Sequence, residues 1–259
     1  MSDCAEKAEP STAKVLAEVE RRTAEKERSS VTDLSEGQRR IVVFLDRIIF
    51  WLSKHWIVIL NTLALLYVGL PVLAPILMHL GASGVGNAIY RLYEPLCHQL
   101  PRRSFFLFGE QLTYSYEELV ARVGVDVLPS PWTRSFLGND VVGYKIGICQ
   151  RDVAIYGSIF LAGIVYGLLK DRVKIKPLPI WAYFLMCVPM ALDGGIQLLS
   201  AFLGTLWPNS PFPSYESTPM SRVLTGTLFG VATIWLAYPY LQEASEEFRE
   251  KLQKRFGWE

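Results

Sequence analysis

Four residues in two short motifs carry side chains that bind metal ions. Cys97 and His98 are adjacent, and Cys149 precedes Asp152 by three positions. Two thiols, an imidazole and a carboxylate together suit tetrahedral coordination of zinc or another divalent metal ion. If a helix begins by Gln150, the side chains of Cys149 and Asp152 can face the same point. The four residues therefore form one candidate metal or redox-active site.

The adjacent pair sets a condition on this site. Neighbouring side chains diverge along a chain, so Cys97 and His98 cannot face one point unless the backbone bends. Pro95 and Pro101 flank the pair and permit such a bend. Two other interpretations stay open: a Cys97–Cys149 disulfide that ties this segment to the rest of the protein, and unpaired residues without a role.

Asp193 is the strongest single indication of a buried polar site. It is the only charged residue between Pro177 and Glu216. A carboxylate in a membrane-spanning helix costs about 2.5–3.5 kcal/mol near the bilayer centre, so it needs a cation, a metal ion or a proton as its partner. Gln197, one helical turn further on, extends a narrow polar face. The alternative is an ion pair with Arg222 or Arg151 that only stabilises helix packing.

A membrane domain is needed to position these residues. The chain has 259 residues, and its 26 Lys and Arg against 25 Asp and Glu leave a net charge of +1, which excludes a basic nucleic-acid-binding protein. Four apolar stretches with almost no charge are each long enough to cross a lipid bilayer. We therefore expect an all-α fold, a polytopic membrane helical bundle of about four transmembrane helices. The spans are expected at roughly residues 56–80, 153–169, 178–203 and 222–241.

The distribution of Lys and Arg predicts the orientation. These residues gather in the 170–176 turn and beside the first and last spans, whereas residues 205–221 contain none before Arg222. Because cytoplasmic loops carry the excess of Lys and Arg, both termini and the 170–176 turn are expected in the cytoplasm. The segments 81–152 and 205–221 then lie outside. The expected location is the cytoplasmic membrane.

The expected organisation has several parts. They are a charged, disordered cytoplasmic tail (1–34), an amphipathic interfacial helix (35–55), a four-span membrane domain with an outer loop (56–242, loop 81–152) and a charged cytoplasmic C-terminal tail (243–259). Ser35 and Gln38 make a capping-box signature at the start of the second part. This part is either a helix on the membrane surface or an extension of the first span.

Small residues predict where helices pack. Gly163 and Gly167 in the second span, and Gly226 and Gly230 in the fourth, have the spacing that lets helix backbones approach closely. We expect at least one of the two pairs to lie at a helix contact within the chain.

Four motifs in order point to a family. They are Cys97-His98-Gln99, Cys149-x-Arg151-Asp152, Asp193-Gly194-x-x-Gln197 and Arg222-x-x-Thr225-Gly226. Over roughly residues 85–240 the chain thus resembles the prokaryotic membrane-protein family labelled domain of unknown function 2085. The resemblance implies a small multi-span membrane protein without an assigned activity. Many members carry a second cysteine where this chain has Asp152, which favours a metal site over dithiol chemistry at positions 149 and 152.

The predicted topology places all the motif residues near the outer membrane face, where they could form one site. A divalent metal would bind to Cys97, His98, Cys149 and Asp152, and an anionic group such as a lipid phosphate would bind among Arg103, Arg151, Asp193, Gln197 and Arg222. The expected function is binding of a metal, an ion or a lipid headgroup, or structural assembly in a larger membrane complex. The alternative is a membrane-embedded metal-dependent or redox enzyme acting on a lipid-borne substrate. Transport is disfavoured because the inner halves of the second and fourth spans lack charged residues.

Overall fold

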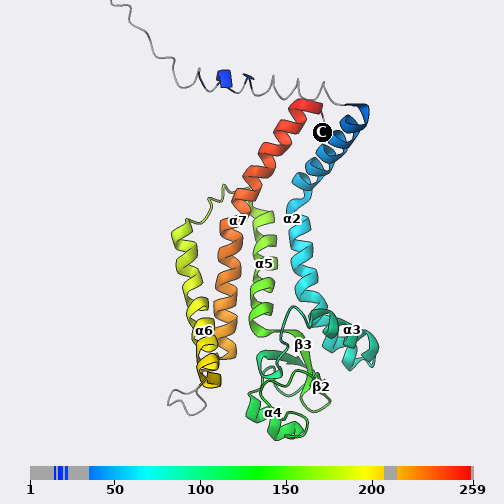
Figure 1. Cartoon of the computed structure of the whole chain (residues 1–259), viewed down its shortest axis with the longest axis vertical. Coiled ribbons are helices and arrows are strands. Elements are labelled where there is room, and N and C mark those ends of the chain that lie inside the picture. Colours follow the sequence, from blue (N-terminus) through cyan, green and yellow to red (C-terminus); the bar gives the residue numbers. More distant parts are fainter. Residues whose placement is uncertain (1–14, 16, 20, 23–34, 207–214, 258–259) are drawn as a thin grey trace, which may run out of the picture. The chain divides into compact units, whose positions relative to one another are not determined.

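Long helices dominate the computed structural model, which describes residues 15, 17–19, 21–22, 35–206 and 215–257. Among these residues, four helices are long and apolar enough to cross a membrane. They are α2 (Glu36–His79), α5 (Gln150–Leu169), α6 (Ile180–Leu206) and α7 (Pro219–Phe256) (Figure 1). The predicted helical bundle with about four spans is confirmed. The side of the membrane on which the termini lie remains a prediction.

The chain divides into two compact units. The smaller unit comprises residues 1–54 and 247–259, and the larger comprises residues 55–246. Helix α2 is continuous through residue 55, as expected if residues 35–55 extend the first span. Ser35 and Gln38 form the predicted capping box: the Gln38 amide donates to Ser35 Oγ at 3.4 Å, and the Ser35 amide donates to Gln38 Oε1 at 3.0 Å. Most of the expected 1–34 tail lies outside the described residues.

Glycine residues let α5 pack closely against α7 on one side and α2 on the other. A Cβ atom added at Gly230 of α7 would lie 2.6 Å from the main-chain oxygen of Ile155 on α5, and one added at Gly226 would lie 2.9 Å from that of Arg151. On the other side of α5, a Cβ atom at Gly163 would lie 2.9 Å from Cγ of Asn61 on α2. Both predicted glycine pairs therefore mark helix contacts within the chain.

The segment between α2 and α5 folds into short elements that the sequence analysis did not assign. They are α3 (Ser83–Tyr93), η1 (Pro101–Arg103), β1 (Ser104–Leu107), α4 (Tyr116–Val123), β2 (Gly138–Asn139) and β3 (Gly143–Cys149). The three strands form an antiparallel sheet in the order β1-β3-β2. Side chains of both the loop and the sheet fill a small core, which includes Phe106, Leu119, Leu128 and Val142.

The register of this sheet positions the site. Ser104, the first residue of β1, pairs with Cys149, the last residue of β3. Strand β3 then continues directly into α5, for which Cys149 is the N-cap residue. The segment that contains Cys97 and His98 leads through η1 into β1, so it lies close to the first turn of α5.

Candidate metal and anion site

One cavity collects most of the residues that the sequence analysis selected. Its volume is about 290 Å³. Eight of the nine selected residues line it: Cys97, His98, Arg103, Cys149, Arg151, Asp152, Gln197 and Arg222. The ninth, Asp193, does not line the cavity but forms an ion pair with Arg151, which does. The residues come from the segment between α2 and α5 and from α5, α6 and α7, so only the tertiary fold brings them together.

Within the cavity, three side chains are arranged as metal ligands. The two Sγ atoms of Cys97 and Cys149 and a carboxylate oxygen of Asp152 all lie within 4.8 Å of one another. Cys97 is buried, and Cys149 and Asp152 are half-buried. Two thiolates and a carboxylate are a donor set that zinc accepts. His98 lines the cavity but is exposed and is not part of this close group.

The two thiols face each other and are free. A hydrogen bond from the Cys149 thiol lowers the pKa of Cys97 against the opposing effect of burial. The same interaction, together with burial, raises the pKa of Cys149. Cys97 is therefore the thiol of the pair that loses its proton first, and a bound cation would favour loss of the second proton.

The backbone bends directly after the adjacent Cys97 and His98, at the next residue. Gln99 has a positive φ of 51°, an uncommon backbone conformation for a residue with a side chain. Two long-range contacts hold it there. The Gln99 side-chain amide donates to the main-chain oxygen of Tyr90 at 2.7 Å, and its own main-chain oxygen accepts from Lys145 Nζ at 2.7 Å.

Lys145 is a functional neighbour that the sequence analysis missed. Its side chain is fully buried in β3 and donates to the main-chain oxygens of Gln99 and Arg134, at 2.7 and 2.8 Å. Burial lowers its pKa to about 7, with Cys97 opposing this shift. A single charged residue within the apolar stretch 141–149 was the signal that could have indicated a special role.

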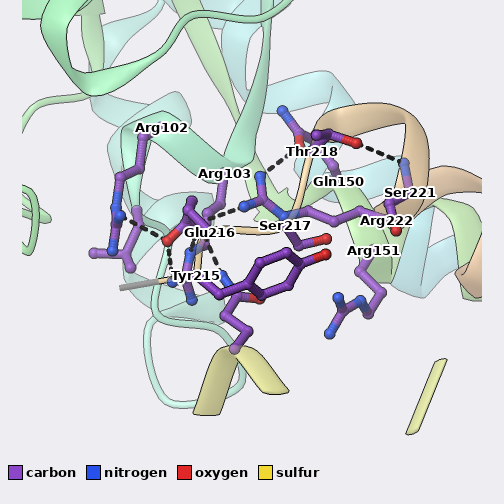
Figure 2. A network of polar contacts seen from close by, with 12 residues as sticks. Arg102, Arg103, Gln150, Arg151, Tyr215, Glu216, Ser217, Thr218, Ser221 and Arg222 are labelled. Atoms are coloured by element: carbon purple, nitrogen blue, oxygen red, sulfur yellow. Dashed lines mark hydrogen bonds and ion pairs between the residues drawn. The ribbon is translucent and has the colours of Figure 1, made fainter. Parts of the chain in front are cut away.

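Glu216 is the second residue that was missed, and it is the centre of a polar network (Figure 2). Its carboxylate accepts hydrogen bonds from Arg102 at 2.7 Å and from Arg103 at 2.7 and 2.8 Å. It also accepts from Gln197 at 2.9 Å and forms an ion pair with Arg222. Burial opposes the shift, but the guanidinium groups lower the pKa of Glu216 overall. As the single charged residue of the 205–221 segment, it was the available counter-charge for the predicted arginines.

Asp193 makes one of the two ion pairs that the sequence left open. Its partner is Arg151 of α5, and not Arg222. Its carboxylate also accepts from the hydroxyl groups of Tyr215 at 2.8 Å and Ser217 at 2.6 Å. The carboxylate of Asp193 is therefore fully partnered and lies outside the group of metal ligands.

Arg222 is held by a second side-chain contact, besides Glu216, that the motifs did not predict. Its guanidinium donates to Oε1 of Gln150 at 3.0 Å. Gln150 is fully buried, and its amide nitrogen donates to the main-chain oxygen of Ser104 at 3.0 Å. The first residue of α5 thus links β1 to α7, which sets the position of Arg222 in the cavity wall.

Comparisons with known proteins agree with this description. The model of the family "Predicted membrane protein (DUF2085)" matches residues 132–236. An uncharacterized protein of Methanocaldococcus jannaschii is 23% identical over 210 residues, which cover 79% of this chain and 99% of that protein. No solved structure matches. The resemblance that the four motifs predicted is therefore confirmed: the chain is similar to the DUF2085 family of predicted multi-span membrane proteins.

Proposed function

We propose that the protein binds a divalent metal ion in a cavity at the outer face of the cytoplasmic membrane. The observation that carries this proposal is the close group formed by Cys97, Cys149 and Asp152, whose ligand atoms lie within 4.8 Å of one another. Zinc is the metal that best suits two sulfur ligands and one oxygen ligand. The outer location rests on the excess of Lys and Arg in the expected cytoplasmic segments.

His98 and the arginines complete the proposed site. His98 lies on the same turn as Cys97 and lines the cavity, so its imidazole is the candidate for a fourth ligand. Arg103, Arg151 and Arg222, which line the same cavity, would receive an anionic group beside the metal. Asp193 and Gln197 would orient these guanidinium groups, through Arg151 and through Glu216 respectively.

Elemental mass spectrometry of the purified full-length protein tests the metal site. We expect close to one zinc or other divalent ion per chain in the wild type and its loss in Cys97→Ser, Cys149→Ser and Asp152→Asn. Cys187→Ser is the matched control, because Cys187 is also a half-buried free thiol but lies on α6 away from the cavity. A metal-free wild type whose Cys97 and Cys149 resist thiol reagents would show a disulfide and refute the proposal.

The three-ligand geometry favours one second function, a metal-dependent enzyme acting on a lipid-borne substrate. Structural zinc sites are closed by four protein ligands, whereas catalytic sites keep one position for water or substrate. His98 is outside the close group, which leaves such a position in the cavity. Cobalt-substituted protein distinguishes the two: a change in its visible spectrum upon addition of azide shows an open position. An unchanged spectrum that becomes azide-sensitive in His98→Ala shows a site closed by His98.

A further inference from the structure

A second cavity lies next to the proposed metal site and is built mostly from other residues. Its volume is about 350 Å³. It shares Arg103 and Gln197 with the first cavity, but Arg102, Trp132 and Tyr215 line only the second. The Glu216 carboxylate lines it as well, so the network of Figure 2 forms the wall between the two cavities.

The charges in this wall do not balance. Three guanidinium groups, those of Arg102, Arg103 and Arg222, form ion pairs with the single carboxylate of Glu216. Arginine stays protonated in proteins, so this excess of positive charge cannot be removed by loss of a proton. Glu117 attracts Arg102 only from a greater distance. Partly buried positive charge of this kind is stabilised by an anion.

Two of the guanidinium groups lie over an aromatic ring. The Cζ atoms of Arg102 and Arg103 lie 4.9 and 5.7 Å from the ring centroid of Trp132. The Arg102 side chain is only 14% exposed, and its buried Nε atom has no hydrogen-bond partner in the described part of the chain. The hydrogen bonds to Glu216 use one nitrogen of Arg102 and two of Arg103. Further guanidinium N–H groups of both arginines therefore remain for the oxygens of a phosphate.

The cavity is located at the end of a membrane-spanning helix. Ser200, Ala201 and Gly204 line it, and they lie in the last two turns of α6, which ends at Leu206. Beside them, the large side chains of Leu199 and Phe202 are exposed on the helix surface, where lipid chains would cover them. The end of a span is the level at which lipid phosphates lie.

From this combination we propose that the second cavity binds a phosphate group through Arg102 and Arg103, presented by the headgroup of an anionic membrane lipid or as free inorganic phosphate. This goes beyond the proposed metal site and does not depend on it. Small residues of α6 leave room for the phosphate, and Trp132 lies against the two guanidinium groups.

Native mass spectrometry of the delipidated full-length protein tests the proposal. The probes are phosphatidylglycerol, phosphatidylcholine with the same acyl chains, and inorganic phosphate. We expect Arg102→Gln to weaken phosphatidylglycerol binding about tenfold, the effect of losing one hydrogen bond to a charged group. Arg122→Gln is the matched control, because Arg122 also pairs with a carboxylate, that of Glu110, and lies 5.3 Å from an aromatic ring centroid.

The outcomes separate the two phosphate sources and the two sites. Preference for phosphatidylglycerol that inorganic phosphate does not reduce assigns the site to a lipid, whereas competition at comparable concentration assigns it to free phosphate. Trp132→Ala, at a side chain that is 55% exposed and not needed for the core, should weaken the same binding without changing the metal content. If Arg102→Gln and Arg122→Gln bind phosphatidylglycerol equally well, and also bind inorganic phosphate equally well, the proposal is overturned whether or not a metal is present.

Discussion

The side-chain nitrogen of Lys145 lies 2.7 Å from the main-chain oxygen of Gln99, 46 residues earlier in the chain. Its other acceptor is the main-chain oxygen of Arg134. A neutral amine has two N–H donors, and these two carbonyl oxygens use both. The contact therefore satisfies a buried lysine without a carboxylate and holds the turn that directs Cys97 into the cavity.

Stability should rise with pH because of Lys145. Its pKa is about 7 in the folded protein and near 10.5 in the unfolded chain. Between these values the unfolded chain binds a proton that the folded protein has released, so stability rises from pH 7 to pH 10.5 by at most about 1.4 kcal/mol per unit. Thermal unfolding in detergent measures this slope. Lys145→Met should flatten it, whereas Lys170→Met, at an exposed turn, should not; a slope that survives in Lys145→Met would exclude this residue as its source.

Removal of the Asp193 carboxylate should destabilise the bundle strongly. Asp193→Asn leaves Arg151 without its ion-pair partner in a partly buried position, and such a change costs about 3–5 kcal/mol. Asp171→Asn is the control, because Asp171 forms an exposed ion pair with Lys170. Addition of Arg151→Gln should recover part of the loss. If the double variant is as unstable as the sum of the two single variants, the two residues do not interact.

Acid should weaken the polar network that is centred on Glu216. Its pKa is lowered from 4.5 in the folded protein, so its contribution to stability is present above pH 4.5 and is lost as the pH falls below that value. In Glu216→Gln the stability should be lower at neutral pH and should decrease less on acidification. Glu110→Gln, which alters a more exposed arginine pair, should retain the acid sensitivity of the wild type.

A methyl group at Gly230 should force α5 and α7 apart. The added Cβ atom would lie 2.6 Å from the main-chain oxygen of Ile155, which cannot move independently of its helix. Gly230→Ala should therefore lower the free energy of unfolding by about 1–3 kcal/mol. A Cβ atom at Gly157 of α5 meets nothing within 4 Å, so Gly157→Ala should be neutral or slightly stabilising. Similar melting temperatures for the two variants would contradict the close helix contact.

The transmembrane helices could be predicted because the property that defines them is local. The apolar run 153–169 lies within α5, and the run 178–203 overlaps most of α6, because a bilayer requires about 20 apolar residues whatever the neighbouring helices are. The three-stranded sheet β1-β3-β2 could not be predicted in the same way. Strands β1 and β3 are short, and their partners lie far away in the chain. The residue pattern of each strand alone is therefore too weak to predict it.

The candidate site likewise has a part that the sequence predicts and a part that only the tertiary structure determines. Residue types and the distribution of Lys and Arg were enough to predict a membrane bundle and to place Cys97, Cys149 and Asp152 on one side of it. The tertiary structure decided the partners: Asp193 with Arg151, Glu216 with three arginines, and Lys145 with the turn at Gln99. Hydrogen bonds and ion pairs form only within a few ångströms, and the rotation of the helices and the path of the loops set distances on that scale.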